Sequence, residues 1–199
     1  MYAENATGNI VILEPDETLI RRIRDGDDRA FETLVERYQE PMARFIWRVV
    51  PREEDREEVC QDVFVKVYFK LDQFRGDARF STWLFQVAHR TAISHARRKR
   101  IDAAEFEVEP VADERSLEAQ SDDGRLRAIL DEELARLKID ERSVVTLFYA
   151  QDMTVEDIAR VVDRPAGTVK SILHRVRQKL EHRLATQHPG LGPDRENVA

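Results

Sequence analysis

The fold is decided by residues 154–184, which read TVEDIARVVDRPAGTVKSILHRVRQKLEHRL. Thr154 can accept hydrogen bonds from the first free amides of a helix, so the sequence predicts a helix that begins near Val155. Pro165 ends this segment, because a residue that precedes proline is disfavoured in the α region. A second helix is expected from Gly167, with an apolar stripe at helical spacing that comprises Val169, Leu173, Val176, Leu180 and Leu184. Together the two segments predict a helix-turn-helix.

The other faces of the second helix are polar and basic. At 1.5 Å per residue this helix is roughly 27 Å long, enough to cross a DNA major groove with its amino end on the bases. The side chains expected on these faces are Lys170, Ser171, His174, Arg175 and Gln178. The pattern favours DNA binding, and the alternative is the ordinary solvated face of a packed helix.

Length and composition limit the class of protein. A chain of 199 residues with 42% hydrophobic content fits one or two small domains. The amino end offers only Ile10 to Leu13 as an apolar run, and no run approaches the ~18 residues that span a bilayer. We therefore expect a cytoplasmic protein without membrane insertion. The single cysteine, Cys60, has no partner for an internal disulfide and is expected in the core.

The net charge of −7 is unusual for a nucleic-acid-binding protein, but it is concentrated in one interval. Between Asp102 and Asp123 there are nine acidic residues and one basic residue, so this interval outweighs the negative charge of the whole chain. It also contains Pro110 and lacks an apolar period, which is typical of a flexible linker between two domains. Simple solubility is the alternative explanation. Basic clusters flank it: Arg90, Arg97, Arg98, Lys99 and Arg100 before, and Lys170, Arg175, Arg177, Lys179 and Arg183 after.

The amino-terminal half is predicted to be helical throughout. Pro41 is expected to bend or break its second helix. A third helix should open after Pro51, with an apolar face made by Val59, Cys60, Val63, Phe64, Val67, Tyr68 and Leu71. Its other face carries an acidic strip, made by Glu54, Glu58, Gln61 and Asp62. Spacing alone leaves two explanations open, namely capping with solubility, or a docking surface for a basic protein partner.

A polar loop at residues 72–80 leads into a helix from Ser81 to about Arg98. One exposed line of this helix should carry Gln86, Arg90, Ser94 and Arg97, opposite the core positions Trp83, Leu84, Val87, Ala88 and Ala92. Basic groups next to the aromatic residues Phe74, Phe80 and Trp83 would suit single-stranded DNA, where stacking and backbone contacts combine. The alternative for these aromatic residues is a place in the core.

No pattern of an enzyme is present. The sequence lacks a phosphate-binding glycine loop, a HExxH motif and a Cys/His set at metal spacing, so we expect no catalysis, no cofactor and no metal. The histidines are scattered, and they are interpreted as surface or phosphate-contacting residues: His89, His95, His174, His182 and His188.

Four motifs in order carry a family resemblance. They are DGDDRAF at 25–31 with LVERY at 34–38, DREEVCQDVF at 55–64, FRGDARFSTWL at 74–84, and Ala159 with GTVKS at 167–171. From about Asp16 to Leu184 the chain resembles an extracytoplasmic-function (group 4, RpoE-like) sigma factor of bacterial RNA polymerase.

The resemblance implies an all-α protein of two small helical domains joined by a flexible acidic linker. The implied divisions are a flexible N-terminus at 1–15, a sigma-2-like domain at 16–100, the linker at 101–124, a sigma-4-like helix-turn-helix domain at 125–185 and a disordered tail at 186–199.

The resemblance also implies a function without chemistry of its own. The protein would be an alternative sigma factor that binds core RNA polymerase, through the largest-subunit coiled coil and the flap region, and directs promoter-specific initiation. It would read the minus-35 element as duplex DNA, and would melt and read the minus-10 element. An anti-sigma factor is a further implied partner.

The motifs assign residues to each role as the resemblance implies. Core polymerase would be bound by Asp55, Glu57, Glu58, Gln61 and Asp62. The minus-10 element would be bound by Phe74, Arg75, Asp77, Arg79, Arg90, Ser94, Arg97 and Arg98. The minus-35 element would be bound by Thr168, Lys170, Ser171, His174 and Arg175.

The chain departs from the family pattern at a few positions. Arg90 and Ser94 stand where relatives often carry Asn or Asp, and Ile172 replaces a common Arg, so the promoter sequence does not transfer. Lys138 likewise stands where a proline is usual. The alternative function is a stand-alone helix-turn-helix regulator, which would leave the acidic strip and the aromatic loop unexplained. An adaptor or anti-sigma protein would not need two basic faces.

Overall fold

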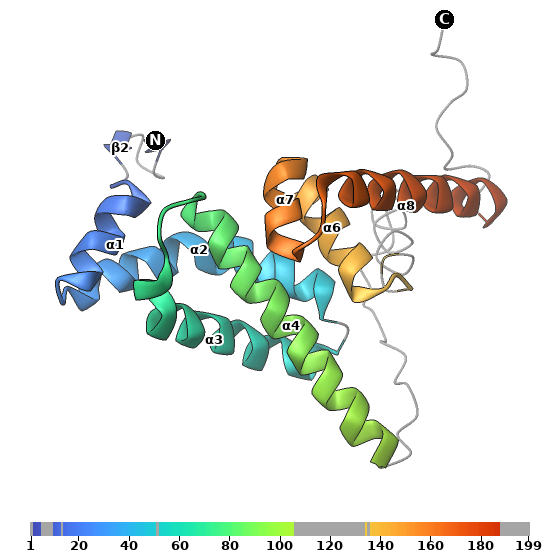
Figure 1. The fold of residues 1–199 in the computed structure, drawn as a ribbon, viewed down its shortest axis with the longest axis horizontal. Coiled ribbons are helices and arrows are strands. Elements are labelled where there is room, and N and C mark those ends of the chain that lie inside the picture. The colour runs from blue at the N-terminus through green and yellow to red at the C-terminus, as the bar shows by residue number, and fades with distance from the viewer. Residues whose placement is uncertain are drawn as a thin grey trace, which may run out of the picture.

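The computed structural model describes residues 2–4, 10–12, 14–50, 52–105, 134 and 136–187 (Figure 1). The described elements, in chain order, are β1 (Tyr2–Glu4), β2 (Ile10–Ile12), α1 (Asp16–Arg24), α2 (Asp28–Val49), α3 (Glu53–Lys70), the short 3₁₀ helix η1 (Leu71–Gln73), α4 (Phe80–Glu105), α6 (Ile139–Ala150), α7 (Val155–Val162) and α8 (Ala166–Gln187). The fold is therefore built from helices, as predicted, with a small ribbon added at the amino end.

The ribbon at the amino end was not expected from the sequence. β1 and β2 pair antiparallel, with Tyr2 opposite Ile12 and Glu4 opposite Ile10. This places regular structure inside the segment 1–15 that was predicted to be flexible. Each strand has only three residues, and neither shows a clear alternation of apolar and polar residues. The sequence therefore gave no signal of this pairing.

Helix α2 excludes one of the two effects predicted for Pro41, namely a break of the helix. Asp27 caps the helix, since its side chain accepts a hydrogen bond from the Arg29 amide at 3.1 Å. Pro41 then lies inside a helix that continues to Val49, so it does not break the helix. Met42, Phe45 and Ile46 follow it directly and are fully buried. Their packing stabilises the helical path against the hydrogen bond that proline removes.

The helix-turn-helix forms as predicted. Thr154 caps α7, because its hydroxyl accepts a hydrogen bond from the Asp157 amide at 3.1 Å. Helix α7 ends at Val162, and Asp163 after it adopts a left-handed conformation with φ of 54°. The Arg164 amide then donates to the Ala159 carbonyl at 3.0 Å and closes the helix end. Helix α8 begins just after Pro165, where the sequence predicted a new helix.

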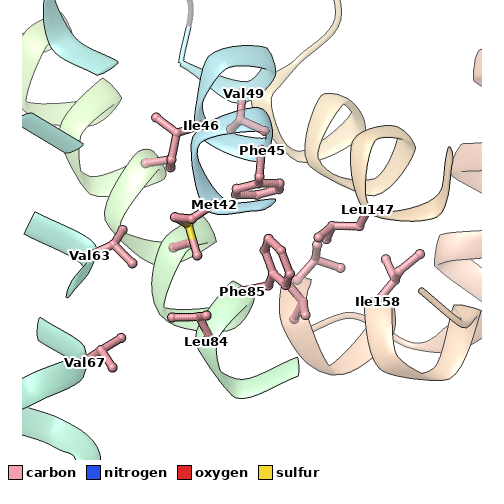
Figure 2. Packing of buried hydrophobic residues seen from close by; sticks show 14 of the residues in the cluster. Met42, Phe45, Ile46, Val49, Val63, Val67, Leu84, Phe85, Leu147 and Ile158 are labelled. Carbon is pink, nitrogen blue, oxygen red and sulfur yellow. The ribbon is translucent and has the colours of Figure 1, made fainter. Parts of the chain in front are cut away.

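The core runs without a break through both halves of the chain (Figure 2). Helix α4 lies between α3 on one side and α7 on the other, and α2 also packs on α6. Leu84 of α4 faces the α3 side, whereas Phe85 points toward Leu147 of α6 and Ile158 of α7. The residues of the two predicted domains are therefore packed together in this structure.

Helix α4 is longer than predicted. It continues through Glu105, so the first residues of the predicted linker at 101–124 are helical. The remainder of that linker lies outside the described residues. Helix α8 continues to Gln187, so the first two residues of the predicted tail at 186–199 are helical, and the rest of that tail lies outside the described residues. Among the helices that the structure describes, none is long and apolar enough to cross a membrane.

Candidate nucleic-acid and polymerase interface

Helix α8 separates a buried row from an exposed polar face. Val169, Ile172 and Val176 are buried against α6 and α7. All five residues predicted for the minus-35 element are exposed: Thr168, Lys170, Ser171, His174 and Arg175. Ile172 belongs to the buried row, so the departure from the family pattern at this position does not remove a group from the exposed face.

Two residues of the α8 face are held in place by hydrogen bonds. The Ser171 hydroxyl donates to the Gly167 carbonyl at 2.9 Å, within the first turns of the helix. Arg175 donates to the Glu141 carboxylate of α6 at 2.6 Å and still keeps 63% of its side chain exposed. This pair orients the guanidinium at the surface. A cationic face of this kind is suited to DNA phosphates.

The loop between η1 and α4 is supported from beneath by aromatic rings. The ring centroids of Phe74, Phe80 and Trp83 lie 5.6 to 5.8 Å from one another. Phe74 is only 7% exposed, so its ring belongs to the core in this structure. Arg24 of α1 also donates to the Leu71 and Phe74 carbonyls.

The polar residues of the same loop point to solvent. Gly76 takes a φ of 79°, a left-handed conformation that residues with a side chain rarely adopt, and so makes the turn. Arg75, Asp77 and Arg79 around it are exposed. The structure thus separates the predicted minus-10 set of the loop into a buried ring and three exposed charges.

The predicted DNA face of α4 is partly covered by the helix-turn-helix. The Gln86 side chain donates to the Arg160 carbonyl of α7 at 2.9 Å, and the Thr82 hydroxyl donates to Asp157 at 3.2 Å. Further along α4, Arg90, Arg97 and Arg98 are exposed, and Ser94 is half-buried. The basic part of this face is open, whereas its amino-terminal part contacts α7.

His89 and His95 correct the expectation that the histidines lie at the surface, because both are buried. His89 is 3% exposed, and its Nδ1 atom lies 3.0 Å from the Ser143 hydroxyl of α6. Its Nε2 atom lies 3.8 Å from the Asp140 carboxylate. Burial lowers the pKa of His89, and the nearby Asp140 offsets only part of that shift. This histidine is a contact between the two halves of the protein.

The acidic strip of α3 is exposed over most of its length. Its members Glu54, Glu58 and Gln61 face solvent, and so does the neighbouring Glu57, which accepts a hydrogen bond from Gln61 at 3.2 Å. Asp62 accepts a hydrogen bond from Lys66 at 2.7 Å and keeps 36% of its side chain exposed. An acidic surface of this kind can receive basic side chains of a protein partner.

Asp55 differs from the rest of the predicted polymerase-binding set. It is 4% exposed and faces α4, where Lys99 lies 3.1 Å from one carboxylate oxygen and His95 lies 3.1 Å from the other. Burial raises the pKa of Asp55, but the contacts from His95 and Lys99 outweigh burial, so the pKa lies below its ordinary value. The helical period gives the signal for this burial, since Asp55 precedes the buried Val59 by four residues.

Comparisons with known proteins agree with this arrangement. The family model of sigma-70 region 2 matches residues 34–101, and that of sigma-70 region 4 matches residues 127–180. The ECF RNA polymerase sigma-E factor of Escherichia coli strain K12 is 33% identical over 183 residues, which cover 85% of this chain and 94% of that protein. The chain belongs to the ECF sigma factor family. It is an alternative sigma factor, which directs promoter-specific transcription.

Further relatives and solved structures fit the same family. The RNA polymerase sigma-H factor of Pseudomonas aeruginosa is 35% identical over 182 residues, covering 86% of this sigma factor and 94% of that protein. CnrH, solved with the cytosolic domain of CnrY, aligns with a TM-score of 0.64 at 25% identity over 86% of this chain and 97% of its own. The sigma factor RpoE of Bartonella quintana, solved with the anti-sigma factor NepR, shares the fold with a TM-score of 0.67 at 23% identity over 78% and 97% of the two chains.

Two buried arginines of this sigma factor were missed by the sequence interpretation. Arg56 of α3 donates to the Val50 carbonyl at 3.1 Å and lies 4.9 Å from the centre of the Trp47 ring. Arg142 of α6 donates to the Leu137 carbonyl at 2.9 Å, and burial lowers its pKa. It also reaches the Val49 carbonyl at 3.4 Å, so a region 4 side chain caps the end of a region 2 helix.

Proposed function

We propose that this sigma factor reads the minus-35 element with α8, captures minus-10 bases with the loop and α4, and docks on core polymerase through the acidic strip of α3. On this proposal it supplies no catalysis of its own and acts in the bacterial cytoplasm. The observation that carries the proposal is the exposed face of α8, where every predicted DNA contact faces solvent above a buried row.

For the minus-35 element, the length and charge of α8 favour the major groove. Helix α8 has 22 residues, or about 33 Å at 1.5 Å each, and its contact residues lie in its first turns. Lys170 and Arg175 can neutralise phosphates, whereas Ser171 and His174 can hydrogen-bond to base edges. The amino end of a recognition helix is the part that enters the groove in helix-turn-helix proteins.

For the minus-10 element, the exposed arginines of α4 and the loop supply backbone contacts to an opened strand. Arg90, Arg97 and Arg98 follow one another along α4 on the side away from the core. Unstacking a base costs a few kcal/mol, which a pocket near Arg75 and Arg79 would offset. Phe74 would shape this pocket from beneath, because its ring is packed against Phe80 and Trp83.

Simultaneous reading of both elements requires the two halves to separate. The positions −35 and −10 that give the two elements their names are about 25 base pairs apart, or roughly 85 Å at ~3.4 Å per pair. In the structure α4 and α7 are in contact, joined by the Gln86 and Thr82 hydrogen bonds. Opening of the α4–α7 contact is therefore part of the proposal.

We also propose that an anti-sigma factor controls this opening. The sigma factor RpoE of Bartonella quintana, which shares the fold, was solved in complex with the anti-sigma factor NepR. A partner that binds the packed form more tightly than the separated form shifts the protein toward the packed form. Polymerase binding, which on this proposal uses the separated form, would then be weakened by up to the ratio of the partner's two affinities. The α4–α7 contact is the element that such a partner would hold closed.

The test of the proposal is reconstitution with bacterial core RNA polymerase. We expect the protein to bind core enzyme and to produce new start sites in runoff transcription on genomic fragments that include its own upstream region. Asp62→Lys should weaken core binding, because it reverses one charge of the acidic strip. Glu32→Lys, which changes an exposed acid of α2, should not.

The core-binding results distinguish a sigma factor that docks through the acidic strip from a stand-alone DNA-binding regulator. Equal core binding by wild type and Asp62→Lys would remove the acidic strip from the interface. Absence of core binding, together with a duplex footprint by the isolated protein, would favour a stand-alone regulator of the helix-turn-helix type.

A further inference from the structure

Three side chains from α3 and α4 converge at the amino end of α3. Asp55 and Glu58 lie three residues apart on α3 and therefore share one side of the helix. His95 comes from the facing side of α4. One ligand atom from each residue lies within 4.8 Å of the other two. Metal sites in helical proteins are often built in this way, from side chains of facing helices.

The Nε2 atom of His95 gives an independent indication of a ligand. His95 is 6% exposed, and its Nε2 atom is buried without a hydrogen-bond partner. The atom lies 3.1 Å from the Asp55 carboxylate, within the distance of an ion pair, but the contact does not have the geometry of a hydrogen bond. A buried polar atom without a hydrogen bond is costly, and it needs an explanation.

A shared metal ion accounts for both the short separation and the missing hydrogen bond. Zinc binds imidazole nitrogen and carboxylate oxygen at about 2.0–2.1 Å, so two ligands at the tetrahedral angle lie about 3.3 Å apart. In such a site the nitrogen lone pair points to the metal and not to the other ligand. Lys99 contacts the second oxygen of Asp55 at 3.1 Å, which leaves the oxygen nearest His95 for the metal and orients the carboxylate.

We propose that Asp55, Glu58 and His95 form a binding site for a divalent transition-metal ion, with Zn²⁺ as its expected occupant. The three side chains supply one imidazole nitrogen and two carboxylates, a set that suits zinc, whereas magnesium and calcium prefer oxygen ligands alone. Glu58 is exposed, so its side chain can rotate to complete the site, and a fourth position stays open to water. The sequence interpretation expected no metal, because these ligands come from two helices and show no local spacing.

The site would alter the acidic strip of α3. Glu58 belongs to the set predicted to dock on core polymerase, and a bound cation would neutralise it and fix its position. This consequence rests on the proposed function. Binding of the metal itself does not, and a titration without polymerase tests it separately.

The experiment is a zinc titration of the full-length protein after chelator treatment, followed by competition with a chromogenic chelator. We expect saturable binding of one Zn²⁺ per chain, and no comparable binding of Mg²⁺. Glu58→Gln should weaken zinc binding by about tenfold or more, since loss of a ligand costs at least as much as loss of an outer-shell partner. Glu54→Gln, an exposed acid of the same helical turn, should bind as wild type does.

Cobalt substitution gives a second measurement. Co²⁺ in a four-coordinate site with a nitrogen ligand should give strong visible absorption that is lost in Glu58→Gln and in His95→Gln. Because His95 is buried, His95→Gln could impair folding, and the exposed Glu58→Gln variant keeps the test valid.

The proposal is overturned by either of two results. One is the absence of saturable zinc binding by wild type. The other is zinc binding that neither Glu58→Gln nor His95→Gln alters, because the metal would then be held by other histidines such as His174 or His182.

Discussion

The two faces proposed to bind DNA differ in how much of each is exposed. On α8 all the predicted minus-35 contacts face solvent, and the helix buries only its apolar row. On α4 the amino-terminal part of the face is bonded to α7, and only the arginines beyond it are open. The exposed residues proposed for the minus-35 element therefore need no rearrangement to reach DNA, whereas on our proposal the minus-10 residues of α4 need the two halves to separate.

The largest expected effect is a loss of folding stability when the aromatic contact made by Phe85, between the two packed halves of the protein, is removed. Phe85 lies 5.4 Å from Phe45 between ring centroids and points toward Leu147 and Ile158 (Figure 2). Phe85→Ala should lower the free energy of unfolding by about 3–5 kcal/mol, because it leaves a cavity between region 2 and region 4. Urea denaturation measures the loss. Phe69→Ala, which truncates a phenylalanine that is 77% exposed, should change stability by less than about 0.5 kcal/mol. Similar small losses in both variants would show that the packed form does not depend on this ring.

A pH-dependent effect is expected at the contact between α4 and α6. Burial lowers the pKa of His89 below its ordinary value of 6.5, and Asp140, Arg90 and Arg164 are the charged groups that face it. The unfolded chain therefore binds more protons than the folded chain below about pH 6.5, so the stabilisation present above that pH is lost as the pH falls toward the folded pKa.

The expected slope is at most about 1.4 kcal/mol per pH unit. Denaturation curves between neutral and mildly acidic pH should show this loss in wild type. His89→Gln should remove the part of the pH dependence of the unfolding free energy that titration of His89 causes. His174→Gln, at an exposed position of α8, should keep the wild-type profile. A profile unchanged by His89→Gln would mean that this histidine is not a buried neutral contact.

The difference between the two faces also marks what the sequence could predict. The helix-turn-helix was predictable because its signals are local: the Thr154 cap, the break before Pro165 and the apolar period of α8. The acidic strip of α3 followed from the same periodicity. Packing of α4 on α7 was not predictable, because it joins residues far apart in the chain, and the polar residues Thr82 and Gln86 that bond to α7 carry no local signal of this contact.

The predictions that failed are mainly those that placed polar side chains at the surface, where the structure buries them. His89 and Asp55 lie on helix faces that pack against another helix, and each has a partner supplied from outside its own helix. A polar residue is buried when such a partner is available, which composition and spacing do not reveal. The continuous path of α2 through Pro41 has a similar cause, since the buried residues beyond it decide the backbone.

A smaller effect is expected from one hydrogen bond between the halves. Thr82 is 2% exposed and donates to Asp157 at 3.2 Å. Thr82→Val keeps the shape and removes this bond, so the packed form should lose about 1 kcal/mol relative to the separated form, or about fivefold in population. Energy transfer between dyes on α1 and α8 measures the separated fraction. Thr33→Val removes an exposed hydroxyl that bonds within α2, and it should leave the fraction unchanged. Equal changes in both variants would contradict a specific role of the Thr82 bond.

The smallest expected effect is a change in how DNA affinity depends on salt concentration, and this change distinguishes the α4 face from the α8 face. Each phosphate contact contributes about 0.9 to the slope of log affinity against log salt concentration. For the free protein on a minus-35 duplex, Lys170→Ala should reduce the slope by about that amount, whereas Arg90→Ala should not, since α4 has no DNA to contact. In the holoenzyme on a complete promoter, where the halves have separated, both variants should reduce the slope. If Arg90→Ala already reduced the slope for the free protein on the minus-35 duplex, both faces would bind one DNA segment in the packed form. Separation would then not be needed to bring the minus-10 face to DNA, and the contrast between α4 and α8 would be one of exposure alone.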